Sequence, residues 1–240
     1  GGAVGEVLRM GCGTRGARFG DVPPSRPTDR DTGELWSARN ASADGSAFDV
    51  ILRGAPVGRV SWKLLGDHNV ANALSALAAA RHAGVTAAVA IDALTRFAGV
   101  KRRLEVLAEV GEVVVYDDFA HHPTAIRTTL QGLRNRVGDE EILAIVEPRT
   151  HTMSLGTLRD ELITCCGAAD SAFWFRGENI KWDLAEVVSN CVVPARLFDD
   201  LESLMGAVAE LPRRRRHVVI LSNGGFQGIH RKLPGMLRGG

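Results

Sequence analysis

The run EVVVYDDFAHHPTAIRTTL, residues 112–130, decides the fold. It opens with a β-branched strand pattern, passes through two aspartates and two histidines, and continues as a helical pattern. Pro123 suits the first position of that helix, and His122 lies just outside it. A strand that leads directly into a helix is the repeating unit of an α/β protein with a parallel sheet.

The alternation of strand and helix continues to the end of the chain. Strands are predicted at residues 112–116, 142–146, 172–175, 196–198 and 217–221, and helices at 123–134, 158–165, 184–190 and 201–211. This order implies right-handed crossovers and a mostly parallel sheet with helices on both faces.

The pattern upstream of this repeat is different. Residues 21–33, DVPPSRPTDRDTG, are predicted to form an exposed loop. The run AFDVILRGAPVGRVSWKLLG, residues 47–66, alternates apolar and polar side chains and predicts a β-hairpin that turns between Gly54 and Gly58. An alanine- and leucine-rich helix is predicted from Asp67 to a terminating Gly84.

A domain boundary is predicted near Val100. A second helix, at about residues 86–97, is followed by the basic step KRR at residues 101–103, where composition and periodicity both change. A length of 240 residues fits one large domain or two modest ones, and this change favours two.

Composition limits the class of protein. Hydrophobic residues make up 45% of the chain and charged residues 24%, which is typical of a globular protein with a packed core. A net charge of +1 and a pI near 7.9 give no bulk attraction for nucleic acid or an anionic membrane. No apolar run approaches the roughly 20 residues that span a bilayer. No signal-peptide pattern is present, and the Gly-Gly-Ala start, without methionine, is not expected to be a native beginning.

The four cysteines lack CxxC spacing. They are Cys12, Cys165, Cys166 and Cys191. We interpret them as free thiols of a cytoplasmic protein and expect no zinc site. The other basic cluster, Arg213 to Arg216, has no interleaved aromatic residues, so a solvated loop is favoured over a nucleic-acid surface.

Polar residues and glycines follow the predicted strands, where sheets of this class bind ligands. Asp117 and Asp118 follow one strand, and Glu147, Pro148 and Arg149 follow the next. Gly177 and the segment Ser222, Asn223, Gly224 and Gly225 follow two others. Backbone N–H groups at residues 223–225 could form an anion nest, although glycines there could equally make a tight turn. Asp118 could likewise be a turn residue.

A second candidate segment is GDHNVANA, residues 66–73. Asp67 or His68 could cap the helix, and the spacing lets His68, Asn69 and Asn72 share one face of its first turn. The structural alternative is that Asn69 is a cap and Asn72 faces solvent.

Taken together, five stretches resemble the Mur ligase family of peptidoglycan enzymes. They are GDHNVANALSALAAARHAGV, GVKRRLE, VYDDFAHHPTAIRTTL, EPRTHTM and LSNGGFQGIHRKL. The resemblance implies a Rossmann-like C-terminal domain at residues 101–240, preceded at residues 1–100 by the end of a central ATPase domain. EPRTHTM and SNGGFQGIH favour the member that joins the tripeptide L-alanyl-γ-D-glutamyl-meso-diaminopimelate to UDP-N-acetylmuramate in cell-wall recycling. The alternatives are the member that adds L-alanine, and a nucleotide- or peptide-binding module without catalysis.

The resemblance also implies chemistry and site residues. Family members use ATP and Mg²⁺ to convert the substrate carboxylate to an acyl phosphate, which the incoming amine attacks to give an amide. His68, Asn69, Asn72, Arg103 and Asp118 match nucleotide-site residues of the family, with Arg103 the catalytic arginine and Asp118 placed toward the ribose. Arg149, Asn223, Gly224 and Gly225 are predicted to lie on the peptide side; His151 departs from the asparagine expected by analogy.

One family motif is absent from this sequence. None of the lysines, at positions 63, 101, 181 and 232, is preceded by glycine and followed by Ser or Thr as in a G-x-x-x-x-G-K-[ST] phosphate loop. We therefore expect the chain alone to fold, at least from about residue 100, but not to catalyse ligation.

Overall fold

The computed structural model describes residues 17–19, 34–148, 158–178, 180, 182–212 and 214–239. The chain divides into two compact units, Gly1–Ala98 and Gly99–Gly240. The loop predicted at 21–33, together with Cys12, Arg149, His151 and Arg213, lies outside the described residues. In the described part of the chain, no helix is long and apolar enough to cross a membrane.

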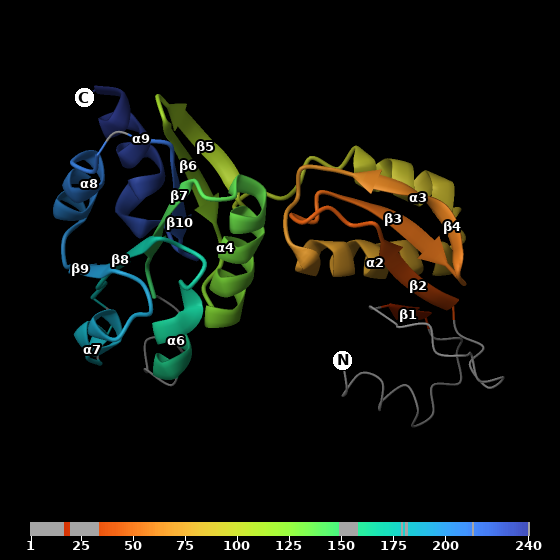
Figure 1. The fold of residues 1–240 in the computed structure, drawn as a ribbon, viewed down its shortest axis with the longest axis horizontal. Helices are drawn as coiled ribbons and strands as arrows, with labels where there is room; N and C mark the ends of the chain where they lie inside the picture. The colour runs from red at the N-terminus through yellow and green to blue at the C-terminus, as the bar shows by residue number, and fades with distance from the viewer. Residues whose placement is uncertain are drawn as a thin grey trace. The chain divides into compact units, whose positions relative to one another are not determined.

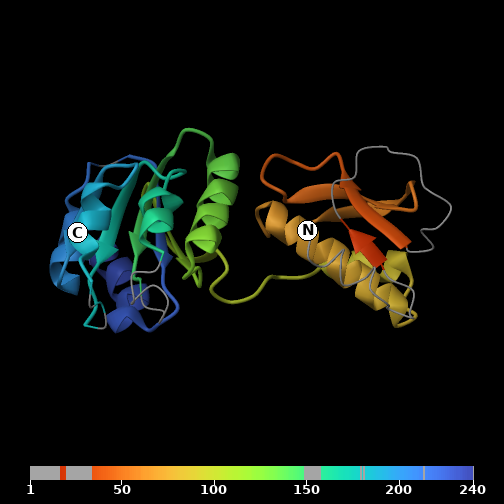
Figure 2. The same ribbon diagram turned by 90° about the horizontal axis from the view of Figure 1, so that it is seen from below.

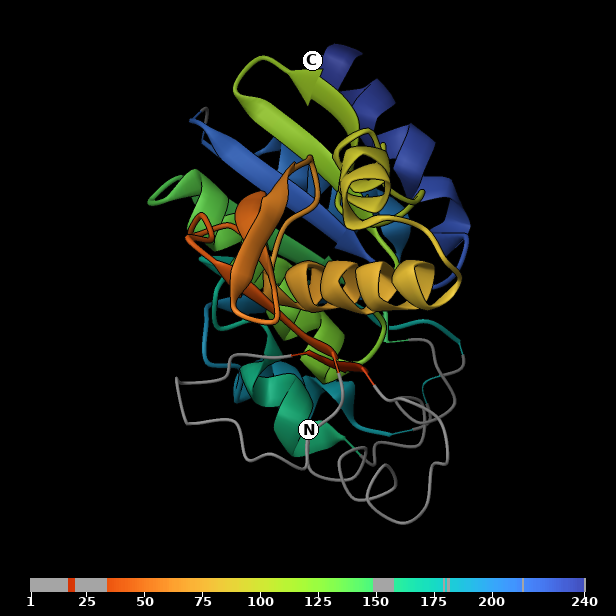
Figure 3. The ribbon, with the colours of Figure 1, turned by 90° about the vertical axis from the view of Figure 1, so that its right-hand side faces the viewer.

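The first unit packs two helices on a small sheet (Figure 1). Its strands, in spatial order, are β1 (Ala17–Phe19), β2 (Glu34–Arg39), β3 (Ala47–Leu52) and β4 (Ala55–Ser61). β1 is parallel to β2, and the other pairs are antiparallel. The helices are α2 (Asp67–His82) and α3 (Ala87–Thr95). Figure 2 shows α2 along the sheet, and Figure 3 shows α2 from the side and α3 nearly end-on.

The β3–β4 hairpin is tighter than predicted. Leu52 pairs with Ala55, so the turn is Arg53-Gly54 rather than a loop reaching Gly58. Both turn residues have positive φ, 53° and 83°, which matches the twist of a two-residue hairpin. Pro56 lies on β4, the edge strand, where a missing N–H group is tolerated.

α2 begins at Asp67, as predicted, but its cap is different. The N-cap residue is Gly66 with φ of 88°, and no side chain caps the helix. A side-chain cap by Asp67 or His68 is therefore wrong, and so is the structural alternative in which Asn69 is a cap. The predicted apolar face of Val70, Leu74, Leu77 and Ala78 is buried.

The second unit is an α/β domain with a six-stranded sheet in the order β5-β6-β10-β7-β8-β9. Its strands are β5 (Glu105–Val110), β6 (Val113–Asp118), β7 (Glu141–Val146), β8 (Ser171–Phe175), β9 (Ala195–Phe198) and β10 (Arg216–Leu221). Its helices are α4 (Pro123–Val137), α6 (Arg159–Cys165), α7 (Leu184–Ser189), α8 (Leu201–Ala209), the short 3₁₀ helix η1 (Phe226–Gly228) and α9 (Ile229–Gly239). All neighbouring strands are parallel except β5 and β6.

The predicted parallel sheet is confirmed, with each predicted strand within two residues of its observed bounds. β5 was not predicted. Val110 pairs with Val113 across Gly111, which has φ of 57°, so β5 and β6 form a hairpin at the edge of the sheet. α8 and α9 cover one face of this sheet, and α4 and α6 cover the other (Figure 1).

The arginine run before β10 is more than a solvated loop. Arg216 is 2% exposed and, like Arg214, forms an ion pair with Glu141, while Arg215 pairs with Glu140. A guanidinium can bind a carboxylate through more than one N–H group, which suits these arginines to joining β10 to the start of β7. The expectation of a purely solvated run is therefore wrong for Arg216.

Candidate functional site

Three strand ends in the second unit bring polar residues to one edge of the sheet. Asp118 of β6, Leu221 of β10 and Val146 of β7 lie at the same level in the strand register. Because β10 lies between β6 and β7, the residues that follow these strands become neighbours. Asp117, Glu147 and Ser222, which the sequence placed at the carboxyl ends of their strands, lie there: Asp117 in the last two residues of β6, and Glu147 and Ser222 directly after β7 and β10.

Glu147 and Ser222 form the inner part of this edge. Both are buried, and the Ser222 Oγ donates to Glu147 Oε2 at 2.5 Å. The backbone N–H of Gly224 donates to the same Ser222 Oγ at 3.0 Å. That N–H is already bound within the chain, which weakens the predicted anion nest at residues 223–225. The Oδ1 atom of Asn223 is buried and has no hydrogen-bond partner among the residues that the structure describes.

Arg102 connects the strand ends, a role that the sequence did not predict. Its Nε donates to Asp117 Oδ2 at 3.0 Å, and its Nη2 donates to the carbonyl oxygens of Ser222 and Gly224 at 2.5 and 3.1 Å. Its guanidinium also lies 5.1 Å from the centre of the Phe119 ring. Asp117, only 5% exposed, has a second close neighbour in His230, whose Nε2 is 3.2 Å from Asp117 Oδ1.

Asp118 is buried and fully engaged by the chain. Its Oδ2 accepts from the Leu104 N–H at 2.8 Å, and its Oδ1 accepts from the Ala120 N–H at 2.7 Å and the Thr129 hydroxyl at 3.4 Å. Burial raises the pKa of Asp118, while these hydrogen bonds and the charge of Arg103 oppose the rise. With 2% of its surface exposed, Asp118 fixes the chain around it, and its contact with a ribose stays a prediction.

Arg103, the predicted catalytic arginine, points into solvent between two strained residues. Arg102 and Leu104 have φ angles of 59° and 47°, a backbone region that residues other than glycine rarely adopt. The Arg102 carbonyl accepts from the Phe119 N–H at 2.8 Å, and Asp118 holds the N–H of Leu104. These bonds present an exposed Arg103 side chain to any anion near this edge.

Two histidines follow Phe119 and have structural contacts. His121 Nδ1 lies 2.8 Å from the Phe119 carbonyl oxygen, and its ring packs edge-on against the Phe119 ring. His122 is the N-cap residue of α4, and its side chain accepts from the Thr124 N–H. The prediction that His122 lies just outside a helix starting at Pro123 is confirmed.

The first unit holds the predicted asparagines. Asn69 Nδ2 donates to the Leu65 carbonyl at 2.8 Å, and Asn72 Nδ2 is 3.5 Å from Asn69 Oδ1. Asn72 is exposed, and His68 is half-buried beside them. The structure thus brings Asn69 and Asn72 together at the start of α2, with the amide of Asn72 accessible.

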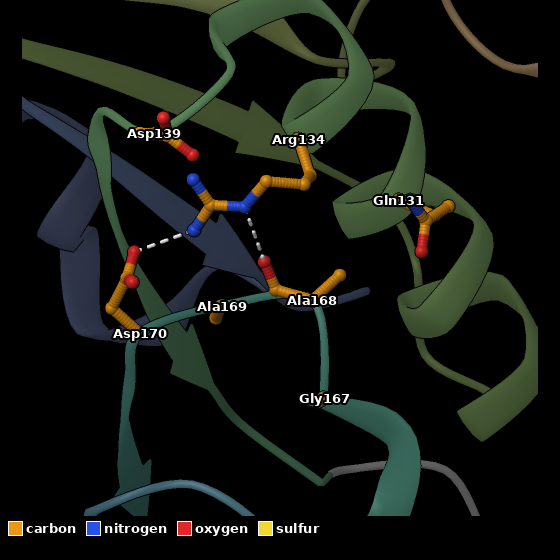
Figure 4. A pocket seen from close by; sticks show the side chains of 7 residues that line it. All are labelled: Gln131, Arg134, Asp139, Gly167, Ala168, Ala169 and Asp170. Carbon is orange, nitrogen blue, oxygen red and sulfur yellow. Dashed lines mark hydrogen bonds and ion pairs between the residues drawn. The ribbon is translucent and has the colours of Figure 1, made fainter.

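A pocket of about 550 Å³ lies away from this edge, beside the starts of β7 and β8 (Figure 4). Arg134 crosses it and donates to Asp170 Oδ2 and to the carbonyls of Gly138, Glu140 and Ala168 at 2.5 to 3.1 Å. Because its donors are bound by the chain, Arg134 joins α4 to the loops before the two strands. We interpret this pocket as structural.

Among the predicted site residues, the first unit has an exposed amide at Asn72, and the second unit has an exposed guanidinium at Arg103. Guanidinium groups can bind phosphate through paired N–H groups. Within the described ranges, no group of three or more His, Cys, Asp or Glu side chains is arranged to hold a metal ion.

Comparisons with known proteins give a consistent result. The family model "Mur ligase, glutamate ligase domain" matches residues 102–224. The chain is 46% identical over 199 residues to UDP-N-acetylmuramate–L-alanyl-γ-D-glutamyl-meso-2,6-diaminoheptandioate ligase of Escherichia coli, a match that covers 82% of this chain and 44% of the relative. It is 35% identical over 182 residues to UDP-N-acetylmuramate–L-alanine ligase of Lactococcus lactis, covering 76% and 38%.

This chain is also similar to a solved structure. The crystal structure of a murein peptide ligase from Psychrobacter arcticus aligns with a TM-score of 0.66 and 39% identity, over 85% of this chain and 44% of that one. The chain therefore spans less than half the length of these relatives.

Proposed function

Because the chain belongs to the Mur ligase family, we propose that it is part of an ATP-dependent amide ligase that joins L-alanyl-γ-D-glutamyl-meso-diaminopimelate to UDP-N-acetylmuramate. The observation that carries the proposal is 46% identity, over 82% of the chain, to a ligase named for these substrates. The match to L-alanine ligases is weaker, at 35%. L-alanine is accordingly the second candidate acceptor.

In this proposal the two units have separate tasks. Residues 1–100 are the end of the ATPase domain, and residues 101–240 are the C-terminal domain that recruits the peptide. ATP, with Mg²⁺, supplies the phosphoryl group that activates the substrate carboxylate. His68, Asn69 and Asn72 in the first unit, and Arg103 and Asp118 in the second, are assigned to the nucleotide site.

The chemistry of each residue supports its task. Arg103 is exposed and lies between two residues with positive φ, so its guanidinium is accessible to a phosphoryl group. Asp118 holds the N–H of Leu104 and so keeps Arg103 in place. Arg149 and the Asn223–Gly225 loop are assigned to the carboxylates of the peptide, for which a guanidinium and backbone N–H groups are suitable partners.

Calorimetric titration of the 240-residue chain with the tripeptide, and separately with L-alanine, tests the acceptor. We expect the tripeptide to bind and L-alanine to bind at least tenfold more weakly, a difference of about 1.4 kcal/mol. Equal affinities, or L-alanine binding alone, would favour the second candidate. ADP release from ATP, UDP-N-acetylmuramate and tripeptide is expected to be absent, and its detection would overturn the prediction that the chain alone is inactive.

A further inference from the structure

Arg102 contacts three segments that are far apart in the sequence. It starts in the strained step before β5, pairs with Asp117 at the end of β6, and donates to Ser222 and Gly224 after β10. The last two contacts join residues 120 and 122 positions apart. A planar guanidinium can donate in several fixed directions, which a lysine ammonium on a flexible stem cannot reproduce.

The residues that follow the loop bound by Arg102 have an unfavourable backbone. Phe226, Gln227 and Gly228 have consecutive positive φ angles of 39°, 48° and 81°. At Phe226 and Gln227, which are not glycines, such a conformation costs on the order of 1 kcal/mol or more and persists only when the surroundings impose it. The buried Phe226 ring, 5.0 Å from Phe175, fixes the far end of the segment. Arg102 fixes the near end through the carbonyls of Ser222 and Gly224.

We propose that Arg102 is a positioning residue that keeps the loop at residues 222–225 in the shape required for peptide binding. The proposal rests on the proposed function, in which this loop faces the peptide. Arg102 acts through the loop. The carbonyl oxygens of Ser222 and Gly224 both accept from its Nη2, which fixes the orientation of these two peptide groups. Their N–H sides, and Asn223 between them, therefore face the peptide in one orientation. Without the guanidinium these carbonyls lose their shared donor and the loop samples other shapes.

Arg102→Lys in the full 240-residue chain is the informative variant. Lysine keeps a positive charge beside the buried Asp117, which protects the fold, but it cannot replace all three hydrogen bonds. Arg214→Lys is the matched control: it also alters an ion-paired arginine of the second unit, at the opposite end of β10. Amide hydrogen exchange of residues 222–228 and calorimetric affinity for the tripeptide are measured on both variants and on wild type.

We expect Arg102→Lys to stay folded, with a lower melting temperature because hydrogen bonds are lost. Exchange in residues 222–228, and the Kd for the tripeptide, are each expected to rise about tenfold, the change that losing one charged hydrogen bond produces. Saturating tripeptide should restore slow exchange in the loop, because binding selects the ordered shape. Arg214→Lys should change neither quantity.

The outcomes separate this proposal from the proposed function. If the wild-type chain binds the tripeptide and Arg102→Lys leaves either loop exchange or affinity unchanged, the role of Arg102 is refuted and the proposed function stands. If the wild-type chain binds no tripeptide, the proposed function is refuted, and the assignment of the loop to peptide binding falls with it.

Discussion

Replacing Arg134 with lysine should destabilise the second unit by about 2–4 kcal/mol. Arg134 donates to three backbone carbonyls and to Asp170, and lysine can keep one or two of these four bonds. Three of these four bonds are exposed, so each lost bond costs about 0.5–1.5 kcal/mol, and two or three are lost. The side chain is 23% exposed, so water replaces part of the loss and the lower half of the range is expected.

Urea unfolding of the full chain measures this change, with native-state hydrogen exchange at β7 and β8 assigning it to the second unit. Arg127→Lys, on the same helix, is the control because Arg127 is exposed and makes one 3.3 Å hydrogen bond, to Thr164. A loss below about 1 kcal/mol for Arg134→Lys would contradict the structural role. Stabilisation of wild type by inorganic phosphate that Arg134→Lys abolishes would instead identify the pocket as an anion site.

Three further predictions follow from single contacts. Asp118→Asn should lower the free energy of unfolding by about 1–3 kcal/mol in urea titration, because one buried backbone N–H would face an amide donor; an unchanged midpoint would contradict this. Gly58→Ala should cost about 1–3 kcal/mol by the same measurement, since its Cβ would lie 2.9 Å from Ile91 Cδ1 and its φ is 154°; a neutral effect would show that Ile91 repacks freely. The hydrogen bond from His217 lowers the pKa of Glu140 below its ordinary 4.5. The stability that Glu140 contributes is therefore present above pH 4.5 and is lost as the pH falls through the lowered pKa. The difference in unfolding free energy between wild type and Glu140→Gln should be present at about pH 7 and shrink as the solution is acidified below that pKa; a difference independent of pH would refute the linkage.

The parallel sheet and the ligand edge could be predicted because both follow from local patterns. Continuous β-branched runs alternate with amphipathic segments, and the polar residues that end each run must meet when the strands are parallel. Asp117, Glu147 and Ser222 were found in this way. The β5–β6 hairpin was missed although Gly111 marks its turn, because β5 is mostly half-exposed and follows a basic step.

The role of Arg102 could not be predicted from sequence. It depends on a positive φ at a residue that carries no glycine signal, and on carbonyl groups about 120 positions away. The prediction of a side-chain cap for α2 was wrong for a related reason. The N-cap residue is Gly66, with φ of 88°, and neither Asp67 nor His68 caps the helix. Both the contacts of Arg102 and the N-cap of α2 depend on tertiary geometry rather than on residue type.

The position of β10 has a consequence for how the protein is made. Among the described strands of the six-stranded sheet, β10 is synthesised last, yet it lies between β6 and β7, with Val115 and Leu143 both paired to Val218. A nascent chain that ends before residue 216 therefore holds two half-sheets whose inner edges have no partner. Those open edges can pair with other chains, so premature termination anywhere in the second unit should give aggregation-prone products. The ligand edge, which lies across the same three strands, forms only after β10 has been synthesised.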